Sequence, residues 1–421
     1  MQVHGPEVQA LVAGAGPSGM LLAAACAQQG LRVLVLDPDP ARAWVNQYGG
    51  WASDFQALGL EDALAARWPQ AVVHLDQGRQ ALLDEPYATL DNSRLQALLR
   101  ARVEVQGGGL LQGTVARWED LGAHVRVCLT DGRTLEAPVF IQAQGAPSSL
   151  DGPPECQLAY GVLAELEQDP FDIHAAVWMD WRAPSQGWDD ALTRPSFLYA
   201  LPMPQGRVFL EETFLNHALS TQDPSGDEAL ALLERRLWRR LALRGLKVTK
   251  VHHVERCRIR MDVPPPAPSR ALAFGASAGM VHPATGFMVS AAAAAAPKVA
   301  QALAQALPQG GPAATAAAWD ALWPQAQRQT WELYRFGAKA LLDMDTPQVQ
   351  AFFHAFFQLP PAQRRAYLSR SQRPEQLAQT MWDTFWRCPW GLRWRLQRAA
   401  LLDPRPVVRG CFGVGLPKTS P

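Results

Sequence analysis

The stretch from Val8 to Asp37 constrains the fold more than any other part of the chain. A short apolar run, a glycine-rich turn, a helix of small residues and a second apolar run ending at Asp37 follow one another without interruption. In the turn, Gly14 permits a tight bend, Gly16 lets the backbone approach a pyrophosphate, and Gly19 lets the helix pack on its strand. The segment therefore predicts a Rossmann-like dinucleotide-binding domain; the alternative is a glycine-rich turn in an ordinary α/β domain.

Two further features of this stretch fit a dinucleotide. Pro17 and Ser18 belong to the glycine turn and are expected to contact the cofactor, and the helix predicted at Met20–Gln29 follows. The N-terminal N–H groups and positive dipole of this helix favour phosphate. Asp37, at the end of the second strand, is placed to accept hydrogen bonds from a ribose.

The next part of the chain is expected to return to the same sheet. We expect a helix starting near Asp91 with Leu95, Leu98 and Leu99 on one face. Strands are predicted at Val103–Val105, His124–Thr130 and Ala137–Ala143, with a hairpin turn at Asp131-Gly132.

After Gly145 the pattern changes to aromatic strands separated by Pro, Gly and Asp. This pattern predicts a largely antiparallel sheet, followed by a basic amphipathic helix at Asp227–Arg244 and a strand region at Val248–Met261. The predicted strands are Tyr160–Leu166, Ala176–Trp181, Phe197–Leu201 and Arg207–Thr213.

A proline-rich linker then leads into a second strand–glycine–helix unit. The strand Ala271–Phe274 runs into glycine-containing loops and a helix expected at Phe287–Ala296. We expect Gly275, Pro283, Thr285, Gly286 and Met288 to contact the same cofactor as the first glycine turn.

These patterns predict an α/β fold with an α+β second domain. The expected division is residues 1–150 and 269–310 for the cofactor-binding domain, 151–268 for a substrate-binding domain, and 311–421 for a helical region.

Composition excludes several classes of protein. Because 39 basic residues balance 39 acidic ones, nothing indicates a nucleic-acid partner. The six cysteines form no CxxC pair, which argues against a zinc site and a disulfide framework and fits a cytoplasmic location. The first strand begins too early for a signal peptide, and no apolar run is long enough to span a bilayer. We expect no metal.

The chain resembles the flavoprotein lycopene cyclases of plants, cyanobacteria and some other bacteria. The resemblance is carried by the glycine turn with Asp37 and by five further stretches, of which Met179–Arg182 and Phe209-Leu-Glu-Glu-Thr213 are the most specific. The other three are Asn46–Trp51, Tyr160–Glu165 and Gly279–Gly286. The chain departs from the broader flavoprotein pattern at Ala276, where an aspartate is usual, and at Asn92, where a basic residue is usual.

The resemblance implies FAD as cofactor, lycopene and related carotenoids as substrates, and a carboxylic acid that protonates the terminal double bond. It points to Glu211 as this acid, with Glu212 second. Along a strand, adjacent side chains face opposite ways, so only one of the two can enter a pocket. An apolar pocket and a nearby carboxyl both keep such an acid protonated. The alternative is a strand-end acidic pair that is solvated or salt-bridged.

We expect reduced FAD, regenerated by NAD(P)H and not consumed, to stabilise the cation. Tyr48, Trp51, Trp178 and Trp181 are candidates for the pocket wall, although core or lid positions are the alternative. His282 is a candidate base or flavin neighbour or a structural residue, and Asp180 and Arg182 are expected to pair.

The C-terminal region combines two aromatic patterns. Phe352, Phe353, Phe356 and Phe357 form a helical stripe, and four tryptophans from Trp382 to Trp394 alternate with arginines. Either the stripe packs inward, or the region attaches peripherally to a membrane, which we favour.

Two other functions on the same fold remain open at this point. An FAD-dependent monooxygenase or halogenase, or an isoprenoid reductase, would share the cofactor site but would consume NAD(P)H. A non-catalytic flavin-binding or membrane-associated chaperone is a third alternative. The sequence leaves open whether one or both ends of the carotenoid are cyclised, and whether a β or an ε ring forms.

Overall fold

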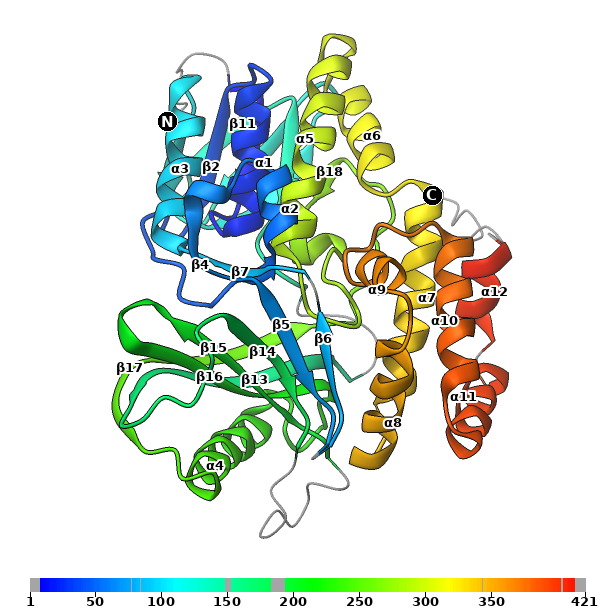
Figure 1. Cartoon of the computed structure of the whole chain (residues 1–421). Helices are drawn as coiled ribbons and strands as arrows, with labels where there is room; N and C mark the ends of the chain where they lie inside the picture. Colours follow the sequence, from blue (N-terminus) through cyan, green and yellow to red (C-terminus); the bar gives the residue numbers. More distant parts are fainter. Residues whose placement is uncertain are drawn as a thin grey trace.

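The computed structural model describes residues 8–76, 78–83, 85–147, 153–182, 194–342, 344–402 and 404–412. The predicted domain boundary at residues 150–151 lies outside the described residues. Figure 1 shows a sheet packed against helices above a second, broader sheet, with the C-terminal helices along one side of the molecule.

The upper sheet is parallel and confirms the predicted Rossmann-like domain. Its strand order is β18 (Ala271–Ala273), β12 (Val139–Gln142), β1 (Ala10–Ala13), β2 (Val33–Asp37) and β8 (Gly109–Gln112). Side chains alternate along the strands, so Val12 packs toward the helices and Leu11 toward a small sheet.

Each face of the parallel sheet has its own cover. The helices α1 (Pro17–Gln28), α3 (Asn92–Val105) and α5 (Val289–Ala306) pack against one face. The antiparallel sheet of β9 (Val115–Asp120), β10 (Val125–Leu129) and β11 (Thr134–Ala137) covers the other.

The second sheet is seven-stranded and, as predicted, largely antiparallel. Its order is β17 (Val248–Arg260), β13 (Glu155–Leu166), β16 (Arg207–Ala218), β15 (Phe197–Met203), β14 (Ala175–Asp180), β5 (Gln70–His74) and β6 (Gln80–Leu83). β5 pairs with β14 in parallel. This sheet therefore includes two strands from residues 1–150, which the sequence grouped with the cofactor-binding domain.

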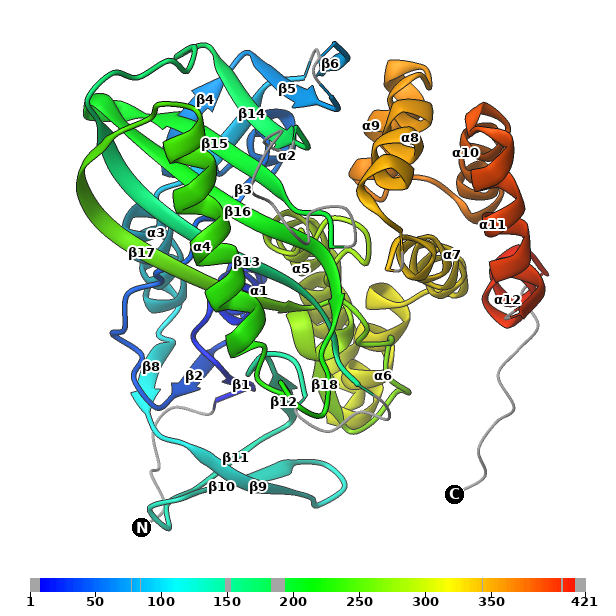
Figure 2. The same ribbon diagram turned by 90° about the horizontal axis from the view of Figure 1, so that it is seen from below.

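The two faces of the second sheet have different environments. Leu158 and Leu210 point to one face, where they pack against Leu233 and Leu237 of α4 (Asp227–Leu243). Figure 2 shows α4 lying across this face. Phe209 points to the opposite face, toward the cofactor-binding domain and the C-terminal helices.

Smaller elements complete the region between the sheets. A three-stranded sheet of β3 (Gly49–Trp51), β7 (Tyr87–Leu90) and β4 (Leu64–Trp68) lies beside α2 (Ala52–Ala57). Short 3₁₀ helices occur at Glu61–Ala63, Pro204–Gly206, Gly275–Ala278 and Leu307–Gln309.

The C-terminal region is helical, as predicted. It comprises α6 (Gly311–Leu322), α7 (Gln325–Leu341), α8 (Thr346–Phe357), α9 (Pro361–Leu368), α10 (Pro374–Arg387), α11 (Trp390–Leu402) and α12 (Arg405–Phe412). The phenylalanine stripe packs inward, since Phe353, Phe356 and Phe357 are buried with Trp178 and Trp181. Among the helices that the structure describes, none is long and apolar enough to cross a membrane.

Some element boundaries differ from the sequence predictions. The strand predicted at Val103–Val105 is wrong, because α3 continues to Val105 and buries Leu95, Leu99 and Val103 at helical spacing. The strand that pairs with the outer edge of β2 is β8, after the turn at Gly107-Gly108. The single strand predicted at 137–143 is divided between the end of β11 and β12.

Candidate active site

The glycine turn of residues 14–19 joins β1 to α1. Gly14 has a φ of 110°, and a Cβ on it would lie 2.7 Å from the backbone carbon of Ala143 on the neighbouring chain segment. A Cβ on Gly19 would collide with the carbonyl oxygen of Gly14. Beside Gly16, by contrast, there is open space at the N-terminus of α1. The turn is thus closed on the protein side and open where a phosphate would approach.

Asp37 holds this turn in shape. Its carboxylate accepts hydrogen bonds from the N–H of Ala15 at 2.8 Å and from the N–H of Asp39 at 2.9 Å. The acid at the end of β2 therefore lies directly beside the glycine turn, as the dinucleotide prediction requires.

The late loop between β18 and α5 meets the first turn of α1. Gly275 has a φ of 76°, and a Cβ there would lie 2.6 Å from Ser18. Ser18 donates its hydroxyl to the sulfur of Met288 at 3.5 Å. Thr285, Gly286 and Met288 line the pocket described below, whereas Pro283 of the same loop is buried and is not part of the lining.

These residues fit a dinucleotide such as FAD. The N-terminus of α1 has Gly16 as its cap and therefore exposes backbone N–H groups. Asn92 donates to the carbonyl oxygens of Trp44 and Asn46, both at 2.8 Å, and its buried Oδ1 has no partner among the described residues. At the late loop, Ala276 lines the pocket, whereas Ser277 donates to the backbone of Gln142.

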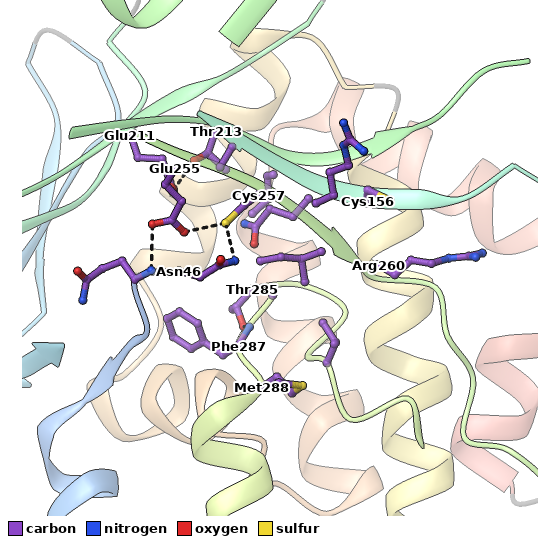
Figure 3. A pocket seen from close by; sticks show the side chains of 18 of the residues that line it. Asn46, Cys156, Glu211, Thr213, Glu255, Cys257, Arg260, Thr285, Phe287 and Met288 are labelled. Carbon is purple, nitrogen blue, oxygen red and sulfur yellow. Dashed lines mark hydrogen bonds between the residues drawn. The ribbon is translucent and has the colours of Figure 1, made fainter. Parts of the chain in front are cut away.

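A pocket of about 790 Å³ opens between the second sheet and the late loop. Its lining is largely apolar and aromatic, with polar groups from β13, β16 and β17, from the loop before β3 and from the late loop. Figure 3 shows Glu211 and Glu255 on the sheet side of the pocket, and Phe287 and Met288 on the side of the late loop.

Glu211 and Glu255 reach the pocket from two strands that are separated by β13. In the register of the sheet, Gly161 of β13 pairs with Glu211 on one side and with Glu255 on the other. A Cβ at Gly161 would lie 3.3 Å from the Cβ of Glu211 and 2.9 Å from the ring of Phe209. Because glycine leaves this space open, carboxylate oxygens of the two glutamates lie within 4.8 Å of each other and of the Cys257 sulfur.

The environment of this pair favours its protonated form. Burial, together with the charge of Glu255, raises the pKa of Glu211 to about 8, although a hydrogen bond from the Thr213 hydroxyl at 2.9 Å opposes this. Burial also raises the pKa of Glu255, against hydrogen bonds from the Cys257 thiol at 2.8 Å and the Gln47 N–H at 2.9 Å. The site can therefore hold a proton at neutral pH.

Glu212, the second predicted acid, lies on the opposite face of the same strand. Its carboxylate accepts two hydrogen bonds from the Arg240 guanidinium of α4, both at 2.7 Å, and one from the Ser196 hydroxyl at 2.6 Å. Both members of this ion pair are fully buried. The period of the strand therefore separates Glu212 from the pocket.

The four predicted aromatic residues divide into two pairs. Tyr48 and Trp178 line the pocket. Trp51 lies behind it, packed on Tyr87 and Trp178. Trp181 packs on Phe197 and Phe353. Two of the four thus form the wall and two support it.

The remaining candidates from the sequence, His282, Asp180 and Arg182, make hydrogen bonds or ion pairs with other protein groups. His282 is buried beside Tyr334, and its Nδ1 accepts the N–H of Ala284 at 3.0 Å. Burial and the charge of Arg370 lower the pKa of His282 to about 3, so its ring is neutral. Asp180 pairs with Arg182 at 2.6 Å, as expected, and also with Arg244 at 2.8 Å.

Sequence reasoning missed Glu255 and Cys257. They are two residues apart on β17, so they share the face that meets the pocket. The spacing of two residues between Glu255 and Cys257 is visible in the sequence. Only the pairing of β17 with β13 brings the two side chains beside Glu211.

Comparisons of this sequence with a family model and with known proteins point to the same protein family. A family model described as lycopene cyclase protein matches residues 10–393. A protein of Capsicum annuum, named lycopene beta cyclase, chloroplastic/chromoplastic, is 36% identical over 382 residues, covering 87% of this chain and 75% of its own length.

Solved structures share the fold at low identity. A mutant of the halogenase PltM in complex with FAD has a TM-score of 0.56 at 12% identity and covers 97% of this chain and 95% of its own. A geranylgeranyl bacteriochlorophyll reductase-like protein from Thermoplasma acidophilum has a TM-score of 0.55 at 14% identity and covers 89% of this chain and 95% of its own. The fold is therefore that of the FAD-binding flavoproteins.

Proposed function

The chain belongs to the lycopene cyclase family, and from this premise we propose that it closes the linear end group of lycopene into a ring, giving γ- or β-carotene in carotenoid biosynthesis. Such an enzyme is an isomerase, because a proton enters at one carbon and another leaves elsewhere. The names of its relatives support this assignment.

The observation that carries the proposal is the buried carboxyl of Glu211, which lies beside that of Glu255 in a pocket with a largely apolar and aromatic lining. Burial and the charge of Glu255 raise the pKa of Glu211 to about 8. Glu211 donates its proton to the terminal double bond, and the neighbouring double bond then attacks the resulting cation. The rings of Tyr48 and Trp178 face the same pocket and would each stabilise a cation by about 0.5–2 kcal/mol.

We assign the cofactor as FAD in its reduced form, with NAD(P)H as the reductant. Gly16, the N-terminus of α1, Asp37 and the late loop at Gly275, Thr285, Gly286 and Met288 would hold it. When bound, the reduced flavin would supply an electron-rich ring that stabilises positive charge.

The first test is an anaerobic incubation of the protein with liposomal lycopene, FAD and NADPH in deuterated buffer. We expect a cyclic product that gains one deuterium per ring in exchange for one hydrogen, while NADPH loss stays far below product formed. An oxygenated or hydrogenated product that tracks NADPH one for one would instead identify a monooxygenase or an isoprenoid reductase.

We also propose that the protein attaches peripherally to a membrane on its cytoplasmic side, through α10 and α11. Trp382, Trp386, Trp390 and Trp394 are each more than half exposed, and α11 carries three arginines and no acidic residue. The Arg393 guanidinium lies 5.4 Å and 5.5 Å from the ring centroids of Trp386 and Trp390. Tryptophan and arginine together suit the headgroup region of an anionic bilayer.

Sedimentation with liposomes tests this attachment. The double change Trp390→Ala and Trp394→Ala should release most of the protein from vesicles containing phosphatidylglycerol. Val105→Ala with Ile173→Ala is the control, since it also removes two exposed apolar side chains but lies away from α10 and α11. Equal binding by both variants would contradict the proposed surface.

A further inference from the structure

The acid alone does not complete the reaction, because a second group must take the proton that leaves when the ring forms. The carbon that gains a proton and the ring-junction carbon that loses one in β-ring formation are bonded to the same carbon of the new ring. Acid and base must therefore lie side by side. In the described structure, Glu255 is the carboxyl that meets this requirement, since its oxygens lie within 4.8 Å of those of Glu211.

The hydrogen bonds of the two carboxyls differ in a way that divides the roles. Glu255 accepts from two donors, one on each oxygen: the Gln47 N–H at 2.9 Å and the Cys257 thiol at 2.8 Å. Glu211 accepts from the Thr213 hydroxyl at 2.9 Å. Hydrogen-bond donors stabilise the ionised form of a carboxyl. When the two carboxyls share one proton, Glu255 therefore carries the negative charge and Glu211 carries the proton.

The backbone also holds Glu255 in place. The Gln47 N–H belongs to the loop before β3, and Asn46 of the same loop donates to the Cys257 sulfur at 3.3 Å. Two segments far apart in the chain therefore fix the carboxylate before substrate enters.

On the basis of the proposed function, we propose that Glu255 is the catalytic base that removes the ring proton, paired with Glu211 across the gap above Gly161. The O–H bond of Glu211 breaks as a C–H bond forms, and the π electrons of the neighbouring double bond form the ring bond. The departing C–H bond leaves its electron pair as the ring double bond, and its proton moves to Glu255. Between turnovers, Glu255 loses this proton to solvent and Glu211 takes one from solvent, which restores the starting state with no net gain or loss of electrons.

The test compares Glu255→Gln, Glu255→Asp and the matched control Glu165→Gln. Glu165 lies on β13 of the same sheet and its carboxyl meets His252, away from the pocket. Rates, product ring isomers and the pH dependence of kcat are measured for each purified variant with bound FAD and an unchanged circular dichroism spectrum.

We expect Glu255→Gln to lower kcat by about 100-fold with little change in KM, because a neutral amide cannot accept the proton. Its product should contain more ring isomers, since the cation then loses protons from other carbons. Removal of the negative charge should also move the high-pH limb of activity to lower pH. Glu255→Asp should recover part of the rate, and Glu165→Gln should behave as wild type.

Several outcomes would overturn the inference. Wild-type rate, products and pH profile in Glu255→Gln, together with an inactive Glu211→Gln, would remove Glu255 from the reaction and leave the proposed function intact. Absence of cyclic product from the wild-type protein would instead refute the proposed function. Loss of activity on chelation, with recovery on adding zinc, would show that Glu211, Glu255 and Cys257 hold a metal ion and not a shared proton.

Discussion

Glu211 and Glu212 are neighbours on β16, yet their carboxyls occupy opposite environments. Glu211 faces the pocket beside another carboxyl, whereas Glu212 faces α4 and forms a fully buried pair with Arg240. Both are surrounded by apolar side chains. Burial alone therefore does not decide the role of a carboxyl. Glu212 has a cationic partner in Arg240, whereas at Glu211 burial and the nearby Glu255 together raise the pKa.

The sharpest test of this difference is Glu211→Gln. We expect kcat to fall by about 10³-fold, because the amide has no proton of suitable acidity to donate. The free energy of unfolding should change little, since the pocket already favours a neutral group there. Kinetics with carotenoid and a denaturant titration check both expectations, and near wild-type activity would remove Glu211 from the acid role.

On the face of the sheet that meets α4, we expect Arg240→Met to lower stability more than either Glu211→Gln or Gly161→Ala. It leaves the Glu212 carboxylate buried without its cation, at a cost of about 3–5 kcal/mol in the free energy of unfolding. Adding Glu212→Leu to this variant should recover most of the loss. Urea titrations of the single and double variants measure the effect; an unchanged stability in Arg240→Met would show that Glu212 does not depend on this partner.

The pH dependence of activity and of stability should follow the protonation of Glu211. The pKa of Glu211 is raised by burial and by Glu255 to about 8, so kcat should decline as the pH rises through this value. The folded protein binds this proton more tightly than the unfolded chain does. The associated stabilisation is therefore complete below the ordinary Glu pKa of about 4.3 and disappears as the pH rises through about 8. Melting temperatures across this range should show a smaller dependence in Glu211→Gln than in wild type.

The smallest expected effect comes from Gly161→Ala. The added Cβ meets the Phe209 ring and the Cβ of Glu211, so it should displace Glu211 from Glu255 while the sheet still forms. We expect about a tenfold loss in kcat with nearly unchanged substrate affinity. Gly109→Ala, at an open position of β8, is the control for the general cost of replacing a strand glycine. Equal kcat in the two variants would mean that the gap at Gly161 is not needed.

The sequence was informative where neighbouring residues determine structure. The glycine turn, the strand ending at Asp37 and the alternation at Glu211 and Glu212 are local patterns, and the structure has the elements they predict. The strand predicted at Val103–Val105 failed because α3 buries Val103 together with Leu95 and Leu99, and that helical stripe outweighs the β-propensity of valine.

The unpredicted features depend on pairing between distant segments. Glu255 becomes a neighbour of Glu211 only through the register of β13 with β16 and β17. Likewise, β5 and β6 follow the cofactor-binding strands in the chain, but their partner is β14. Such pairings depend on tertiary packing, which one sequence does not display.

The pairing of β5 with β14 has a consequence for synthesis and for evolution. During translation, the hairpin β5–β6 is synthesised before β14. It therefore cannot pair with the rest of its sheet until β14 has been synthesised. A recombination event that exchanged residues 1–150 as a block would carry away two strands of the sheet that bears Glu211. The cofactor region and the acid-bearing sheet therefore cannot be exchanged separately at residue 150 without dividing this sheet.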